Sequence, residues 1–271
     1  MKTAVLVFGE FREFETAHTS WKFLENIDYD IYVHTWDTSN DTNSELGINV
    51  KESVDEHRIL KYFPNATVNI EQDKELGLAS ARMIYHIRML FNMMTLSGVK
   101  YDTVILLRPD IYFNDSTNIE SLLIELPNKN ILYGLSTVNH PPPPEFTYVN
   151  DCLFIGTMEL MRNTFLSFFE PDITRKTIHY HLAKHFINND IHIQPIWNNL
   201  LSQHVILRYL HRNYLNCSFE ELREIEGIYA EIKHLMPRVS HDGGQTFEDR
   251  SSEEISKIDK FKSRLKELKH E

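Results

Sequence analysis

Polar and charged side chains border several apolar runs of the chain. They lie at residues Gly9–Arg12, His34–Asp37, Arg108–Asp110 and Asn150–Asp151. The strongest of these places is the stretch LLRPDIYF, in which Asp110 comes soon after an apolar run. A carboxylate held on a rigid strand in this way suits a sugar nucleotide that is bridged by a metal or hydrogen-bonded directly. Pro-Asp is also common turn chemistry, so a plain turn is the alternative interpretation.

Several motifs of nucleotide-binding and hydrolytic enzymes do not occur in the sequence. No G-x-x-x-x-G-K-[ST] is present, which disfavours a P-loop nucleotidase. GEFRE follows the first apolar run in place of G-x-G-x-x-G, which speaks against a dinucleotide dehydrogenase. An α/β-hydrolase would need a G-x-S-x-G elbow, and none occurs. Because the chain has only nine glycines, a nucleotide site would have to be built from side chains and a carboxylate.

Strands and helices alternate in the first half of the chain. Short apolar runs predict strands at 3–8, 29–36, 66–70 and 101–107. Helical patterns lie between them, at 16–26, after a capping box formed by Ser53 and Glu56 with Pro64 as its stop, and from Leu76 to Gly98. This alternation predicts an α/β fold with a Rossmann-like, mostly parallel central sheet flanked by helices. In such a sheet, ligands bind beyond the carboxyl ends of the strands.

The second half of the chain is less regular and mainly helical. Strands are predicted at 131–135 and 152–156, separated by four prolines at 141–144 that form either a rigid connector or a substrate-side loop. Helices are predicted at 157–169, 177–187, 195–211 and 218–235, the last opened by a capping box of Ser218 and Glu221. We predict one main domain over 1–245 and a charged amphipathic helix within 246–271, which packs on the body or forms a partner surface.

Composition narrows the class of protein further. The 271 residues include 28 Lys and Arg against 39 Asp and Glu, a net charge of −11, so a general nucleic-acid binder is disfavoured. A local basic pocket for one anionic ligand remains compatible with this balance. The two cysteines exclude a disulfide scaffold, and we expect a reduced, cytoplasmic setting. No run approaches the ~20 apolar residues of a membrane span, so we expect no transmembrane segment.

Four motifs occur in an order that resembles a known enzyme family. VLVFGEFR, DIYVHTWD, YDTVILLRPDIYF and NDCLFIG follow one another within residues 1–170. Together they resemble the GT-A type glycosyltransferases, and more narrowly a group encoded in bacterial polysaccharide loci, phages and large viruses. In that group a G-x-x-R turn follows the first strand, His-Thr-Trp ends the second and Arg-x-Asp follows the central strand. An aspartate then precedes an apolar FIG strand.

The resemblance implies transfer of a sugar from a nucleoside diphosphate sugar to a glycan, lipid-linked or small-molecule acceptor, in the cytoplasm of a bacterium or of a virus-infected host cell. The residues that it implies for donor binding are Gly9, Arg12, His34, Trp36, Asp37, Arg108 and Asp110. Asp110 would also hold Mn²⁺ or Mg²⁺ as the last residue of a D-x-D element, with His241 completing the metal shell. Arg108 replaces the first aspartate of that element. A guanidinium cannot ligate a metal but can pair with a phosphate, so metal dependence stays open.

Three of the implied roles have plain alternatives. Arg12 contacts the diphosphate or is an exposed surface arginine. Trp36 stacks on the nucleobase or packs in the core, the more frequent use of tryptophan. Asp151 is the general base, an acceptor contact, or a strand-end aspartate that accepts backbone N–H groups.

Two other functions stay open at this point. A sugar nucleotidyltransferase shares the sheet architecture, but it normally carries a G-x-G-T-R loop after the first strand, where this chain has GEFRE. A non-catalytic carbohydrate-binding protein that kept the fold is the third interpretation, with Arg108 marking a lost metal site. Tight binding of a nucleoside diphosphate sugar without turnover would favour that binding protein.

Overall fold

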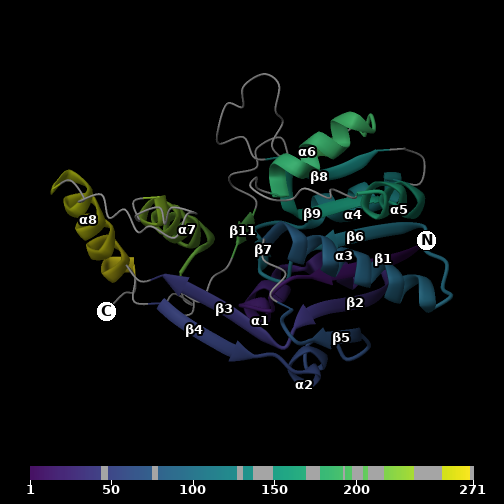
Figure 1. Cartoon of the computed structure of the whole chain (residues 1–271), viewed down its shortest axis with the longest axis horizontal. Helices are drawn as coiled ribbons and strands as arrows, with labels where there is room; N and C mark the ends of the chain where they lie inside the picture. The colour runs from purple at the N-terminus through teal and green to yellow at the C-terminus, as the bar shows by residue number, and fades with distance from the viewer. Residues whose placement is uncertain are drawn as a thin grey trace. The chain divides into compact units, whose positions relative to one another are not determined.

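The computed structural model describes ten stretches of the chain. They are residues 1–43, 48–74, 79–126, 131–136, 149–168, 178–191, 193–196, 204–206, 217–234 and 252–268. The chain divides into two compact units, the first formed by Met1–Ser39 with Glu52–His204 and the second by Asn40–Lys51 with Val205–Glu271. The first unit contains the large sheet that is drawn in Figure 1.

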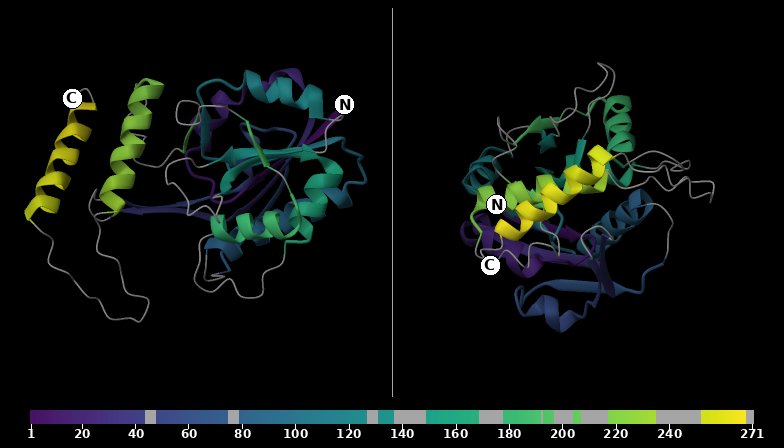
Figure 2. Two further views of the ribbon diagram at one scale, coloured as in Figure 1. Left: turned by 90° about the horizontal axis from the view of Figure 1, so that it is seen from above. Right: turned by 90° about the vertical axis from the view of Figure 1, so that its left-hand side faces the viewer.

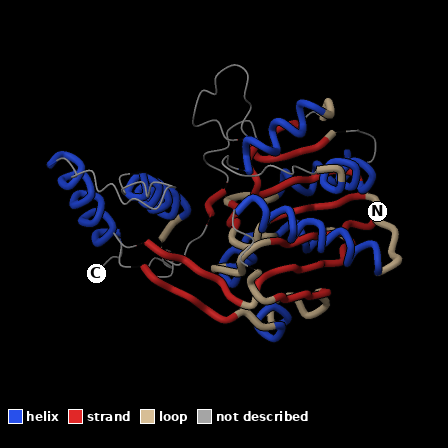
Figure 3. The backbone as a smooth tube through the Cα atoms, in the orientation of Figure 1, coloured by secondary structure: helices blue, strands red, loops and turns tan. Residues whose placement is uncertain are grey.

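Seven strands form this central sheet, which is visible as neighbouring red segments in Figure 3. In sheet order they are β10 (Ile193–Pro195), β8 (Leu132–Ser136), β9 (Val149–Thr157), β6 (Thr103–Leu107), β1 (Lys2–Phe8), β2 (Asp28–Trp36) and β5 (Thr67–Glu71). β1 runs parallel to both β2 and β6, β5 is parallel to β2, and β10 is parallel to β8. Only β9 runs antiparallel to its neighbours β6 and β8. The prediction of a Rossmann-like, mostly parallel α/β sheet is therefore confirmed.

Helices lie on both sides of the sheet, as the turned view in Figure 2 shows. On one side α3 (Ala79–Leu96), α5 (Met158–Leu166) and α6 (Ile178–Asn188) share a core cluster with Ala4 and Leu6 of β1. Val5 and Val7 alternate with these residues and are also fully buried. The other helices of this unit are α1 (Phe14–Ala17), α2 (Glu56–Leu60) and α4 (Thr117–Glu125). Burial of both faces of β1 explains its unbroken apolar run.

The predicted helix over 16–26 is wrong as a continuous element. After α1, the chain forms two short 3-10 turns at His18–Ser20 and Lys22–Asn26. Trp21 donates its indole N–H to the carbonyl of Ile111 at 2.8 Å. The Ser20 hydroxyl donates to a backbone carbonyl of its own segment and accepts from the backbone N–H of Phe113 at 2.9 Å. These bonds tie the segment to β7 (Ile111–Phe113), and they compete with a regular helix.

The predicted capping box at Ser53 is also wrong. Ser53 is the last residue of β4 (Ile48–Ser53), which pairs with β3 (Thr38–Asn43) in a two-stranded sheet. The cap of α2 is Asp55, whose carboxylate accepts from the backbone N–H of Arg58 at 2.7 Å. Ser53 and Asp55 are both of residue types that favour the N-cap position. Because Ser53 belongs to β4, Asp55 caps the helix.

The predicted helix over 195–211 does not form in the part of that range that the structure describes. Pro195 ends strand β10, and His204–Ile206 forms strand β11. Val205 and Ile206 are β-branched, which favours an extended backbone over a helix. The four prolines at 141–144 and residue Leu76 lie outside the described residues.

The second unit contains two packed helices, α7 (Phe219–His234) and α8 (Ser252–Leu268). The predicted capping box of α7 is confirmed, because Glu221 accepts from the backbone N–H of Ser218 at 2.7 Å and Ser218 accepts from the backbone N–H of Glu221 at 3.2 Å. Leu265 is buried, and Arg264 donates two N–H groups to Glu224 of α7 at 2.7 and 2.9 Å. The predicted domain boundary at 245 lies outside the described residues. Within the described stretches, no helix combines the length and apolar character that crossing a bilayer requires.

Candidate functional site

The carboxyl ends of β1 and β6 carry the polar residues that the sequence singles out. β1 leads into Gly9, whose φ of +103° is a conformation that favours glycine and turns the chain toward Arg12. β6 leads directly into Arg108 and Asp110. The antiparallel β9 pairs Leu153 with Leu107, so Asp151 comes to the same edge from the opposite direction. This topology places side chains from three strands together.

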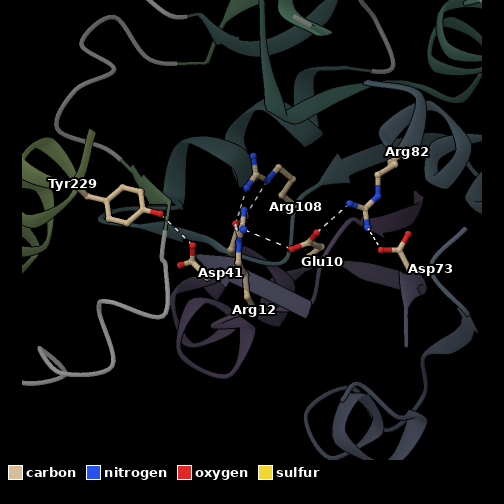
Figure 4. A network of polar contacts seen from close by, with 8 residues as sticks. Glu10, Arg12, Asp41, Asp73, Arg82, Arg108 and Tyr229 are labelled. Atoms are coloured by element: carbon tan, nitrogen blue, oxygen red, sulfur yellow. Dashed lines mark hydrogen bonds and ion pairs between the residues drawn. The ribbon is translucent and has the colours of Figure 1, made fainter. Parts of the chain in front are cut away.

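Asp110 is the centre of this group and is only 1% exposed. Arg108 donates two hydrogen bonds to it, from Nε to Oδ1 at 3.0 Å and from Nη2 to Oδ2 at 2.6 Å. Arg12 donates from Nε to Oδ2 at 3.0 Å (Figure 4). The two guanidinium groups remain partly open to solvent, with side-chain exposures of 15% for Arg12 and 19% for Arg108. Asp110 therefore orients two arginines that are each partly exposed.

A chain of alternating charges extends from this centre, and Figure 4 shows the part of it from Arg108 to Asp73. Arg12 lies 3.6 Å from Glu10, which lies 3.6 Å from Arg82 on its other side. Arg82 pairs with Asp73 at 2.6 Å, and Arg108 lies 3.9 Å from Asp151. In order, the members are Asp73, Arg82, Glu10, Arg12, Asp110, Arg108 and Asp151. We call this set the charged network.

The charged network holds Arg108 firmly in the charged form. Its three arginines face four carboxylates. Burial by itself would lower the pKa of Arg108, but the neighbouring charges, led by Asp110, outweigh it and raise that pKa well above its ordinary value. Such paired guanidinium groups are suited to exchange one carboxylate partner for a phosphate, which they bind with the same fork geometry.

The described residues do not fit a divalent metal at Asp110. Both of its oxygens accept from guanidinium groups, and two positive charges within hydrogen-bond distance would repel a cation. Among the side chains that the structure describes, no three His, Cys, Asp or Glu residues are grouped so that they could hold a metal. His241, the other residue assigned to a metal, lies outside the described residues. We therefore derive no chemical step through a metal ion.

Asp151 is the carboxylate of the network that reaches solvent beside Arg108. Its side chain is 16% exposed, against 1% for Asp110. The neighbouring Cys152 is buried and donates its S–H to Asp151 at 3.5 Å. Burial raises the pKa of the Cys152 thiol well above its usual value, so the thiol stays protonated. Asp151 thus presents a partly exposed carboxylate beside Arg108.

His34 and Trp36 belong to a different, sealed group at the end of β2. His34 is fully buried and shares a hydrogen bond with His86, with 2.6 Å between the two Nδ1 atoms. Trp36 is 1% exposed and stacks on Tyr85, with ring centroids 5.7 Å apart. We call the four residues His34, Trp36, Tyr85 and His86 the aromatic cluster. In the structure Trp36 has the packing role, and neither His34 nor Trp36 presents a face to solvent.

Burial keeps the two histidines of the aromatic cluster neutral. Burial lowers the pKa of His34, and burial together with the nearby His34 and Arg82 lowers the pKa of His86 to about 3. Glu71 supports the cluster from the end of β5, accepting from His34 at 3.3 Å and from Tyr85 at 2.8 Å. Burial alone would raise the pKa of Glu71, but these bonds and one from Lys74 lower it to about 2.

Asp37, the remaining predicted donor contact, is held by its backbone. Its backbone N–H donates to the backbone carbonyl of Glu71, and its carbonyl accepts from the backbone N–H of Val54, both at 2.8 Å. The structure therefore brings together Arg12, Arg108, Asp110 and Asp151, and it places the β2 residues apart.

Sequence reasoning did not single out Arg82, Asp73 or His86. Arg82 and His86 are four residues apart on α3. The amphipathic pattern of this helix predicts its buried apolar face and gives no role to its polar residues. Glu10 belongs to the GEFRE turn, but the sequence motif predicts no role for it.

No protein-family model matches the chain, and no curated protein sequence matches it. Its function has to be inferred from its own residues and their geometry.

Proposed function

We propose that this protein is a glycosyltransferase with a GT-A fold, which moves a sugar from a nucleoside diphosphate sugar to a hydroxyl group of a glycan, lipid-linked or small-molecule acceptor. The observation that supports this proposal is the convergence of Arg12 and Arg108 on Asp110, with Asp151 beside them. The arrangement offers a fixed pair of cations for a diphosphate and a solvent-accessible carboxylate for an acceptor hydroxyl.

The two arginines would stabilise the leaving group. When the bond between the sugar C1 and the phosphate oxygen breaks, negative charge develops on the departing nucleoside diphosphate. Guanidinium groups already oriented by Asp110 need little reorganisation to accept that charge, which is how preorganised cations lower a barrier. Asp110 would then be a positioning residue for Arg12 and Arg108.

Asp151 would act on the acceptor side. In an inverting transfer, its carboxylate takes the proton of the acceptor hydroxyl while that oxygen bonds to C1 and the diphosphate departs. Asp151 lies beside the proposed diphosphate site, because its carboxylate is 3.9 Å from the guanidinium of Arg108. In this proposal, neighbouring side chains of the network stabilise the leaving diphosphate and take the proton of the acceptor hydroxyl.

The direct test combines ligand binding with turnover. A thermal-shift screen of nucleoside diphosphate sugars, with and without Mn²⁺, should show stabilisation by one donor, because a ligand of the native state raises the melting temperature. Release of nucleoside diphosphate from that donor should then be measured for the wild type and for Asp151→Asn. We expect the variant to keep donor binding and to lose turnover by about 100-fold or more. Equal turnover in both proteins would remove Asp151 from the chemistry.

A non-catalytic binding protein is the second candidate, and one observation favours it. Arg108 stands where a D-x-D element has its first, metal-binding aspartate, and it occupies both oxygens of Asp110. The two functions differ in one measurement, since a donor that binds tightly and is never cleaved, even with acceptors present, indicates the binding protein.

A further inference from the structure

Glu10 lies between two arginines of the charged network. One of its carboxylate oxygens is 3.6 Å from Arg12 and the other is 3.6 Å from Arg82. Each arginine also has a closer partner, since Arg12 bonds Asp110 at 3.0 Å and Arg82 bonds Asp73 at 2.6 Å. Both guanidinium groups are therefore anchored by other carboxylates, and Glu10 fills the space that they share (Figure 4).

The distances separate the closer partners of the two arginines from Glu10. Contacts at 2.6 and 3.0 Å are within the range of charge-assisted hydrogen bonds, whereas 3.6 Å is an ion pair without good hydrogen-bond geometry. Glu10 is also 22% exposed. Each of these two ion pairs joins partly solvated groups and contributes little stability, so a phosphate bound more closely can replace them.

Arg82 is held in place from a second direction. Its guanidinium carbon lies 5.7 Å from the centre of the Trp36 ring, a cation–π contact with the sealed aromatic cluster. It comes from the first turns of α3 and is 25% exposed. Stacking on a buried ring and pairing with Asp73 fix its orientation, with Nη1 directed at Glu10.

We propose that Glu10 occupies an anion-binding subsite between Arg12 and Arg82, and that it gives way there to the second phosphate group of the donor. This inference rests on the proposed function and adds Arg82 as a third phosphate-binding residue. A phosphate group carries more negative charge than a carboxylate and offers three oxygens, so it satisfies both guanidinium groups better than Glu10 does. The subsite accordingly selects diphosphates over monophosphates.

The test compares nucleoside diphosphate with monophosphate binding by calorimetry. The probe is whichever of UDP, GDP, ADP, CDP and dTDP stabilises the wild type most in a thermal-shift screen, with its own monophosphate as reference. Glu10→Gln removes the competing charge, and we expect it to tighten diphosphate binding about threefold to tenfold. Arg82→Ala should weaken diphosphate binding about tenfold or more, with monophosphate binding changed less than about twofold. Arg82→Lys keeps the positive charge but lacks the planar fork of the guanidinium. Its diphosphate affinity should therefore lie between those of the wild type and of Arg82→Ala.

Matched controls alter the same charges outside the network. Glu25→Gln changes a glutamate that is 67% exposed and pairs with Lys22, and Arg162→Ala changes an exposed arginine on α5. Neither should alter binding. Melting curves of the unliganded variants show whether Arg82→Ala is folded, and Glu10→Gln provides an independent readout because it predicts a gain of affinity.

Three results would overturn the inference. If the wild type binds the diphosphate and Arg12→Ala loses it, but Glu10→Gln leaves affinity unchanged or weaker, the subsite is wrong while the proposed function stands. Equal losses of diphosphate and monophosphate binding in Arg82→Ala would make Arg82 a support for Trp36 only. A wild type that binds none of the five diphosphates would overturn both the subsite and the proposed function.

Discussion

The charged network and the aromatic cluster lie at neighbouring strand ends of one sheet edge, yet they are built in opposite ways. The network consists of ion pairs whose arginines are 15 to 25% exposed. The cluster consists of stacked rings and two neutral histidines, and His34, Trp36 and His86 are at most 2% exposed. Both regions carry residues that the sequence motifs assign to donor binding. Their different burial agrees with the proposed function, in which a ligand contacts the network and the cluster supports it through Arg82.

Arg82 connects the two regions. It stacks on Trp36 of the cluster and pairs with Asp73 and Glu10 of the network. Changes in the network should therefore affect ligand affinity first, and changes in the cluster should affect the stability of the fold first. The following predictions test that division.

The largest effect is expected from Asp110→Ala. This change removes the inner partner of both Arg12 and Arg108 and leaves two positive charges facing each other. We expect diphosphate affinity to fall at least about 100-fold, and the free energy of unfolding to fall by on the order of 3 kcal/mol, the lower end for breaking a buried ion pair. Calorimetry and urea unfolding measure the two quantities. Unchanged diphosphate affinity in a folded variant would separate Asp110 from the site.

Acidification should destabilise the fold through the aromatic cluster. The pKa of His86 is about 3 in the folded protein and 6.5 for an ordinary histidine, so the unfolded chain binds an extra proton between these values. Stability must therefore fall as the pH falls below 6.5, by about 2 kcal/mol at pH 5 from this residue. Glu71, whose pKa is lowered to about 2, adds to the loss below pH 4.5.

The measurement for this prediction is urea unfolding at pH 7, 6 and 5. His86→Phe removes the titrating group and keeps a ring of similar size, so it should show a flatter pH dependence than the wild type. The same slope in both proteins would mean that the pKa of His86 does not differ between the folded and the unfolded protein.

Trp36→Phe should give the smallest effect on ligand binding. Because Trp36 is 1% exposed and stacks on Tyr85, we expect a stability loss of about 1–2 kcal/mol. Diphosphate affinity should change less than threefold, about 0.6 kcal/mol. If the nucleobase stacks on Trp36 after a rearrangement, affinity for the nucleoside itself would fall about tenfold or more.

Much of the fold could be predicted from local patterns. The runs that become β1, β2, β5 and β6 are short and apolar, and the structure confirms them as parallel strands. The errors arise where tertiary bonds override local preference. Trp21 and Ser20 bond to β7 and break the helix expected over 16–26. Such contacts join residues about ninety positions apart, and no local pattern contains them.

The candidate site was predictable only where its residues sit at strand ends. Arg12, Arg108 and Asp110 follow parallel strands, and such ends meet at one edge of a sheet. The sequence also placed His34 and Trp36 there, because a strand end alone does not reveal which side chains become covered. Tyr85 and His86 of α3 cover them, and this depends on how that helix packs over β2.

The central claim is that Arg12 and Arg108 bind the diphosphate of a nucleotide sugar. Its most direct test is calorimetric titration of a nucleoside diphosphate and of the matching nucleoside into the wild type, Arg12→Ala and Arg108→Ala. We expect each substitution to weaken diphosphate binding about tenfold or more and to change nucleoside binding less than about twofold, because a charge-assisted bond to phosphate is lost and the base contacts are kept. Equal losses for both ligands, or a wild type that binds no nucleoside diphosphate, would contradict the claim.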